Sequence, residues 1–134
     1  MITQKWVEPK NAEHKLFAAS VDLRDKSGNV LVTAYPVLRP DGQWSLMVIN
    51  RDYDNAHDVR ILFRDDSAQT EREFAGPLEI ATFGKAQYQW HPARRNGYAD
   101  PDGPPVSKTI NAGPGAIFTL PPASLNVVCG RVAE

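Results

Sequence analysis

The stretch RPDGQWSLMVINRD, residues 39–52, decides the fold class of this chain. Its Pro-Asp-Gly sequence is typical of a tight turn, because proline presets one backbone angle and glycine adopts the conformation that closes the turn. The residues after the turn, 43–50, alternate as a β-strand does, yet one face carries Trp44, Leu46 and Val48 and the other carries Met47 and Ile49. A strand with water on one side has polar residues there. This strand is therefore expected to be central and covered on both faces, with Trp44 largely buried.

Runs of similar character fill most of the chain. The run 30–38 is rich in β-branched and aromatic residues, and the tight turn joins it to 43–50 as an antiparallel hairpin. The other strand-like runs, each bounded by turn residues, are 14–23, 59–63, 78–84, 86–90, 106–111, 116–120 and 124–132. No segment shows a convincing helical period. About eight to ten short strands predict an all-β fold, an antiparallel β-sandwich of immunoglobulin-like or jelly-roll-like type.

Alternation also predicts which side chains face the core and which face water. In the first run the predicted inward residues are Phe17, Ala19, Val21 and Leu23, and in 59–63 they are Val59, Ile61 and Phe63. Glu79 falls between Leu78 and Ile80 and is expected on a solvated face.

Composition and charge exclude several classes of protein. A chain of 134 residues fits one domain. Its net charge of -1 gives no basic field for nucleic acid or an anionic membrane surface. No apolar run approaches the roughly 20 residues of a membrane span. The first residues, MITQKWVEPKNAEHK, lack the apolar segment of a signal peptide, so the chain is interpreted as a cytoplasmic protein or as a part of something larger.

Motifs that would carry catalysis or bind a cofactor are missing from the sequence. It contains no serine-nucleophile motif, phosphate-binding loop, dinucleotide fingerprint or zinc-protease motif. The single cysteine, Cys129, excludes an internal disulfide and is expected to be a small buried core residue. His14, His57 and His91 show no metal-ligand spacing. No cofactor and no catalytic residue are therefore predicted.

One acidic segment, DYDNAHD (52–58), is a candidate calcium loop. Its candidate ligands are Asp52, Asp54 and Asp58. The pattern departs from the EF-hand loop, because His57 stands where the glycine belongs and Phe63 where the last glutamate belongs. A solvated turn without metal is the competing interpretation.

The longest stretch without strand character is HPARRNGYADPDGPP, residues 91–105. Loops of this length in a compact domain are usually functional or mobile. Aromatic and cationic residues in and before it could stack on sugar rings or dock against another domain: Tyr88, Trp90, His91, Arg94, Arg95 and Tyr98. Alternation along 86–90 places Tyr88 and Trp90 on one face. The competing interpretations are that these aromatics belong to the core, or that the loop simply caps one end of the sandwich.

Several segments together resemble a known kind of domain. The order TAYPVLRPDGQWSLMVINRD, GPLEIATFGKAQYQWHP, ADPDGPP and FTLPPASLNVVCGRV is similar to the C-terminal β-sandwich of clan A glycoside hydrolases, in the style of families thirty-nine, thirty and fifty-one. The closing LPPASLNVV matches a pattern of Leu-Pro-Pro, an aromatic residue, Ser and a final strand. This chain has Ala123 at the aromatic position.

The resemblance implies that residues 1–134 are one accessory sandwich of a larger glycoside hydrolase that acts on plant or bacterial polysaccharide. In such proteins the sandwich packs against a (β/α)₈ catalytic barrel, which needs about 250 residues and cannot fit in this chain. The chain alone is therefore expected not to be an enzyme. A parent enzyme of this kind would be secreted or periplasmic, although this sequence does not locate the chain.

The barrel also offers one answer to what covers the second face of the strand 43–50. That face would consist of Met47 and Ile49 with Leu31, Tyr35 and Val37. The competing account covers it with the loop 91–105. Residues 2–8 are expected to replace an edge strand of the sheet, or else to leave an open edge. An open edge predicts weak self-association into a dimer.

Two other functions stay open at this point. One is a free-standing carbohydrate-binding module that holds an oligo- or polysaccharide with Tyr88 and Trp90. The other is an immunoglobulin-like spacer or interaction module, which would bind neither sugar nor barrel.

Overall fold

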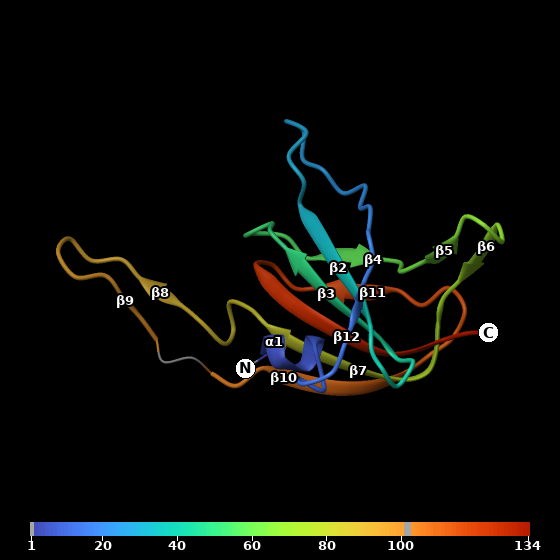
Figure 1. Ribbon diagram of the computed structural model, residues 1–134. Helices are drawn as coiled ribbons and strands as arrows, with labels where there is room; N and C mark the ends of the chain where they lie inside the picture. The colour runs from blue at the N-terminus through green and yellow to red at the C-terminus, as the bar shows by residue number, and fades with distance from the viewer. Residues whose placement is uncertain (1, 101–102) are drawn as a thin grey trace.

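A computed structural model describes residues 2–100 and 103–134 of the protein. The fold is mostly β, with 46% strand and 4% helix, and its sheets are antiparallel, so the predicted fold class is confirmed (Figure 1). The main sheet has six strands, in the order β1 (Lys15–Leu16), β2 (Val32–Leu38), β3 (Trp44–Asn50), β12 (Ser124–Val132), β7 (Phe74–Phe83) and β10 (Val106–Ala112). Within the described residues, no helix is long and apolar enough to cross a membrane.

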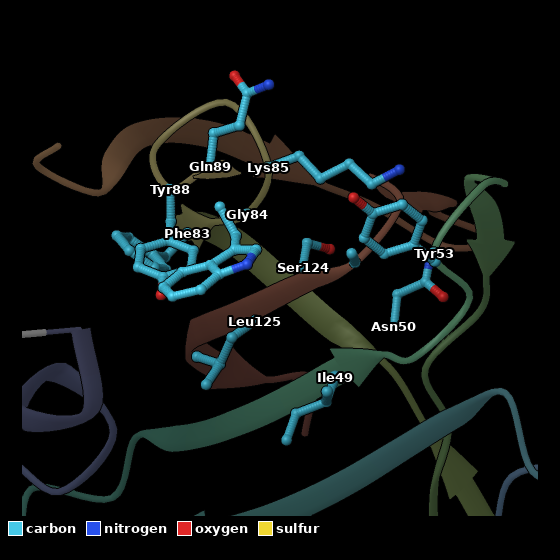
Figure 2. A pocket seen from close by; sticks show the side chains of 12 residues that line it. Ile49, Asn50, Tyr53, Phe83, Gly84, Lys85, Tyr88, Gln89, Ser124 and Leu125 are labelled. Atoms are coloured by element: carbon cyan, nitrogen blue, oxygen red, sulfur yellow. The ribbon is translucent and has the colours of Figure 1, made fainter. Parts of the chain in front are cut away.

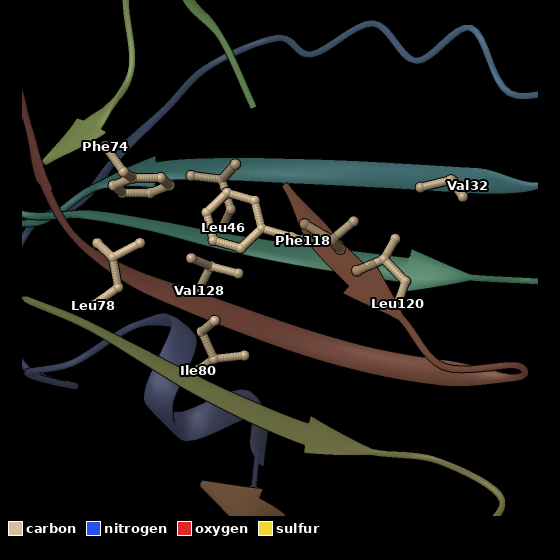
Figure 3. Close-up of a cluster of buried hydrophobic side chains, with 9 residues drawn as sticks. Val32, Leu46, Phe74, Leu78, Ile80, Phe118, Leu120 and Val128 are labelled. Carbon is tan, nitrogen blue, oxygen red and sulfur yellow. The ribbon is translucent and has the colours of Figure 1, made fainter. Parts of the chain in front are cut away.

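A smaller layer covers one face of this sheet. It consists of β4 (His57–Val59) paired with β11 (Phe118–Leu120), and a hairpin of β5 (Phe63–Asp65) and β6 (Thr70–Arg72) flanks it. Figure 3 shows Phe118 close to Leu46 and Val128, and Leu120 close to Val32. Burying a side chain of this size stabilises the fold by roughly 1.5–3 kcal/mol. The two layers therefore share one apolar core.

The opening hairpin forms as the turn sequence predicts. β2 and β3 pair with Tyr35 opposite Met47, and the Gly42 amide donates to the Arg39 carbonyl at 3.0 Å. Gly42 has a φ of 81°, a conformation that a side chain would strain. β3 is the third of six strands, so its predicted central position is confirmed.

Trp44 is half-buried rather than largely buried. Its ring lies between those of Phe17 and Phe63, at centroid distances of 4.8 and 5.0 Å. Phe63 in turn meets the edge of Phe74. Because Trp44 is the first residue of β3, it lies at the end of the sheet, where fewer neighbours enclose it.

The predicted strand 14–23 forms only in part. Beyond β1 the chain leaves the sheet, and although Val21 and Leu23 pack against the core, Phe17 and Ala19 are exposed. The small residues in the middle of this run offer little apolar area to hold it on the sheet. The strand assignment beyond Leu16 and the inward orientation of Ala19 are therefore wrong, whereas Phe17 is 48% exposed with its ring against that of Trp44.

The run 59–63 is divided between β4 and β5 instead of forming one strand. Val59, Ile61 and Phe63 nevertheless all pack against the core, as their alternation predicts. Cys129 is also buried as expected, and its thiol lies 3.3 Å from the Gln43 side-chain oxygen. Burial raises the pKa of the Cys129 thiol.

A short helix, α1 (Ile2–Trp6), covers the middle of the second sheet face (Figure 1). Ile2 is buried there with Ala81 and Val127, and Trp6 packs beside them. The Trp6 indole also donates to the Tyr35 carbonyl at 2.9 Å. The second layer over this face thus comes from the same chain.

The expectation of an edge strand at residues 2–8 is wrong. Ile2 and Trp6 are four residues apart, a spacing that places both on one side of a helix. The edges of the sheet are β1 and β10. Lys5 of the helix forms an ion pair with Glu79, which raises the pKa of Lys5. Glu79 is exposed, as its alternation predicts.

The predicted second face is covered unevenly. Val37 is fully buried and Met47 and Ile49 are half-buried, whereas Tyr35 is 45% exposed. Leu31 does not belong to this face, because it precedes β2 and packs against the core on the opposite side. Beyond the helix, the face near Ile49 opens into a hollow.

Candidate functional site

The hollow lies where β3 and β7 end and β12 begins, and its volume is about 520 Å³. Ile49, Phe83 and Leu125 line it from the second sheet face. Figure 2 shows Tyr53 on one side and Phe83 and Tyr88 on the other, with Leu125 and Ile49 below. Trp90, Lys85 and Gln89 complete the walls. We call this feature the aromatic hollow.

A tight turn after β7 positions Tyr88 in the hollow. The amides of Gln87 and Tyr88 both donate to the Gly84 carbonyl, at 2.9 and 3.1 Å, and the Gly84 amide donates to the Gln87 side chain at 2.8 Å. The chain turns at Gly84, and 86–90 is not the strand that the sequence predicts. Tyr88 and Trp90 therefore share one hollow because of this turn and not because of strand alternation.

The opposite wall depends on a buried asparagine. The Asn50 side chain is 1% exposed and donates to the carbonyls of Asn55 and Pro121 at 3.0 and 2.9 Å. Its side-chain oxygen accepts from the Asp52 amide at 2.9 Å. These bonds join the loop that carries Tyr53 to the turn between β11 and β12.

The carboxylate of Asp52 fixes the same loop. It accepts from the amides of Asp54 and Asn55 at 3.1 Å and from His57 Nε2 at 2.9 Å. The His57 bond, followed by the backbone bonds, lowers the pKa of Asp52 to about 2. The loop is thus held by hydrogen bonds within the protein.

The three candidate calcium ligands of segment 52–58 point to different partners in the structure. Asp58 accepts from the Thr119 hydroxyl, and Asp54 is exposed. Within residues 2–100 and 103–134, no three His, Cys, Asp or Glu side chains meet in a geometry that could hold a metal ion. The Asp52 carboxylate instead accepts the hydrogen bonds that hold the loop of Tyr53.

A cation stands at the rim of the hollow. Lys85 Nζ lies 3.4 Å from the centroid of the Tyr53 ring and 3.9 Å from a carboxylate oxygen of Asp54. A cation over an aromatic face is attracted to its negative π surface. The ammonium group is therefore held in place while it stays partly exposed.

The predicted irregular loop contains a hairpin. β8 (Trp90–His91) pairs with β9 (Tyr98–Ala99), and this hairpin projects from the sandwich (Figure 1). The Asp100 amide donates to the Gln89 carbonyl at 2.8 Å and closes its base. We call residues 89–100 the arm. Residues 101 and 102 of the predicted loop lie outside the described residues.

Two side-chain contacts stiffen the arm. The rings of His91 and Tyr98 stack with centroids 4.9 Å apart, and His91 Nε2 lies 2.9 Å from a carboxylate oxygen of Asp100. On the other side, Gly97 lies against the Trp90 ring so closely that a Cβ there would be 2.3 Å from Cζ2. Each aromatic of the arm therefore has a defined neighbour.

The six residues predicted for binding separate into two groups. Tyr88 and Trp90 line the hollow, whereas His91 and Tyr98 belong to the stem of the arm. Arg94 and Arg95 are exposed in the turn of the arm, together with Pro92, Ala93 and Asn96. The hollow and the arm meet at Gln89 and Trp90.

Sequence reasoning missed several residues of the hollow. Tyr53 and Lys85 are far apart in the sequence and meet only in the folded chain. Phe83 and Gln89 were within recognised runs but carried no special signal. The twelve described residues that line the hollow include no carboxylate, so it supplies contacts and not an acid–base pair.

Comparisons with known proteins give structural matches but no sequence match. No protein-family model matches the sequence, and no curated protein matches it. The fold is similar to part of the thermostable GH51 α-L-arabinofuranosidase from Thermotoga petrophila RKU-1, with a TM-score of 0.48 and 17% sequence identity. The match covers 76% of this chain and 19% of that chain. A match at this level assigns no residue and no activity to this chain.

Proposed function

We propose that this chain is a non-catalytic accessory sandwich of a glycoside hydrolase, which docks through its arm onto a (β/α)₈ catalytic barrel and stabilises it. The observation that carries the proposal is the exposure of aromatic side chains on the arm: Trp90 is 54% exposed and Tyr98 is 60% exposed. An isolated two-stranded hairpin is marginally stable in water. A partner surface against the arm would bury these rings.

The composition of the arm suits a protein interface. Interfaces are enriched in aromatic residues and arginine and depleted in lysine and glutamate. The turn of the arm carries Arg94 and Arg95, whose planar guanidinium groups bind carboxylates with two hydrogen bonds at once. The resemblance of the sequence to sandwiches that accompany a barrel indicates which partner this surface would meet.

The proposal places catalysis in the partner. A retaining glycosidase needs two carboxylates about 5 Å apart across the bond that is cleaved, and the lining of the hollow provides none. The purified chain should therefore release no product from aryl glycosides or polysaccharides. Turnover that survives purification and is lost on substitution of a residue of this chain would contradict the proposal.

Docking can be measured directly with the glycoside hydrolase barrel whose gene lies in the same reading frame or beside it. We expect the two purified parts to associate in sedimentation velocity. The double variant Arg94→Ala/Arg95→Ala should weaken the association at least about tenfold, as loss of interface arginines commonly does. Arg72→Ala on β6, at the other end of the molecule, is the control (Figure 1).

Two results would contradict the proposed accessory function. One is a gene with no such barrel in its frame or beside it. The other is association that is equal for the arm variant and the Arg72→Ala control. A second candidate function, carbohydrate binding, is favoured by a separate observation, the aromatic hollow. A spacer module would show neither association with a barrel nor sugar binding.

A further inference from the structure

We propose that, in the chain without a docked barrel, the aromatic hollow binds a neutral oligosaccharide. Its aromatic walls are the starting point. Tyr53 is 68% exposed, Trp90 54% and Tyr88 42%, and all three border one concave surface. Large aromatics gathered around a depression, instead of scattered singly, mark a binding surface. The volume of about 520 Å³ falls in the range of small-ligand sites.

Both walls are fixed before any ligand arrives. The hydrogen bonds of Asn50 and Asp52 hold the loop of Tyr53, and the turn at Gly84 holds Tyr88. Gly97 lies directly against the Trp90 ring. A site that is already ordered loses little conformational entropy on binding, which favours affinity.

The combination of groups selects the chemical class. The apolar C–H face of a sugar ring packs against the π face of an aromatic ring, and its hydroxyls need hydrogen-bond partners at the rim. The hollow offers the ammonium of Lys85, the amide of Gln89 and the hydroxyls of Tyr53 and Tyr88. An apolar ligand would make no use of these polar groups.

The electrostatics argue for a neutral ligand. Lys85 is the one cation among the described residues that line the hollow, and Asp54 stands 3.9 Å from it. The attraction for an anion is therefore partly cancelled. The net charge of -1 adds no long-range attraction for nucleic acid. A neutral sugar chain needs no such field.

The test is a titration of the purified chain with xylo-, cello- and arabino-oligosaccharides, followed by NMR of backbone amides and tryptophan indoles. We expect saturable shifts at low-millimolar sugar for the Trp90 indole and for the amides of Lys85 and Gln89. The indoles of Trp6 and Trp44, which lie outside the hollow, should not move. They serve as internal controls in the same spectrum.

Matched variants separate the hollow from the arm. Tyr88→Ala should weaken sugar binding at least tenfold, whereas Tyr88→Phe, which keeps the ring, should keep most of it. Tyr98→Ala should leave sugar binding unchanged and weaken docking to the barrel. Each variant should keep the denaturation midpoint of the parent chain, because the substituted side chains are exposed.

Three outcomes would overturn the inference. They are the absence of saturable shifts with all three sugars, equal sugar binding by Tyr88→Ala and the parent chain, and shifts confined to residues 91–100, beyond the hollow. Shifts of hollow residues on addition of the barrel alone, without any response to sugar, would assign the hollow to protein docking instead. The docking proposal fails by a different result, equal association of the Arg94→Ala/Arg95→Ala variant, so the two failures can be told apart.

Discussion

Gly130 and Gly97 are in equally tight places in two very different regions. A Cβ at Gly130 would lie 2.2 Å from Leu78, which is fully buried, and a Cβ at Gly97 would lie 2.3 Å from Trp90, which is 54% exposed. Gly130 belongs to a central strand of the sandwich, whereas Gly97 precedes a strand of two residues in the arm. The comparison shows equally close packing against a buried side chain in the sandwich and against an exposed ring in the arm.

The largest expected loss of stability comes from substituting Asn50, the asparagine that joins two loops of the sandwich. Asn50→Ala removes a buried amide that donates to the carbonyls of Asn55, Leu120 and Pro121, and of these three bonds the one to Leu120 is buried. Unfolding by urea should show a loss of about 2–4 kcal/mol. Asn96→Ala, in the exposed turn of the arm, is the matched control and should stay within about 0.5 kcal/mol of the parent chain.

The glycine pair gives the next effect and tests the comparison itself. Gly130→Ala should destabilise the protein by about 1–3 kcal/mol, because Leu78 has no room to move. Gly97→Ala should leave the free energy of unfolding nearly unchanged but alter the fluorescence of Trp90, whose ring must shift. Equal losses of stability for the two variants would show that the arm is part of the cooperative fold.

The fold was predictable from sequence where alternation and turn chemistry coincide. β2, β3 and β12 follow their expected ranges within about two residues, and the turn between β2 and β3 has the conformation that its glycine allows. The helix α1 was not predictable, because five residues are too few to show a helical period. It is held in place by tertiary packing on Ala81 and Val127.

The candidate site was predictable only in its local part. Tyr88 and Trp90 stand out because they are close in sequence to a long polar stretch. The contact of Lys85 with Tyr53 could not be inferred, because it depends on how two loops far apart in the chain meet. The arm hairpin was missed because each of its strands has only two residues.

A smaller effect is expected on the pH dependence of stability, through Asp52 in the loop that carries Tyr53. The pKa of Asp52 is about 2 in the folded chain and 3.8 without its partners, so the carboxylate stabilises the fold fully above pH 3.8. This contribution is lost as the pH falls through 2. In His57→Ala, NMR titration should show the pKa of Asp52 rising toward 3.8, and an unchanged value would exclude His57 as the main cause.

The smallest effect is expected at Ser45. Its hydroxyl is fully buried and has no hydrogen-bond partner among the described residues. Ser45→Ala removes a buried hydroxyl that makes no hydrogen bond in the fold. The free energy of unfolding should therefore be unchanged or rise by up to about 1 kcal/mol. A loss of more than about 1 kcal/mol in urea would indicate that the hydroxyl has a partner.

Native-state hydrogen exchange tests the division between sandwich and arm most directly. The amide of Val127 is in a central strand, and the amide of Asp100 donates to the Gln89 carbonyl at the base of the arm. We predict that Val127 exchanges only through global unfolding, with a strong dependence on denaturant, whereas Asp100 exchanges far faster and with almost none. Equal opening free energies for the two amides, with the same dependence on denaturant, would contradict the account.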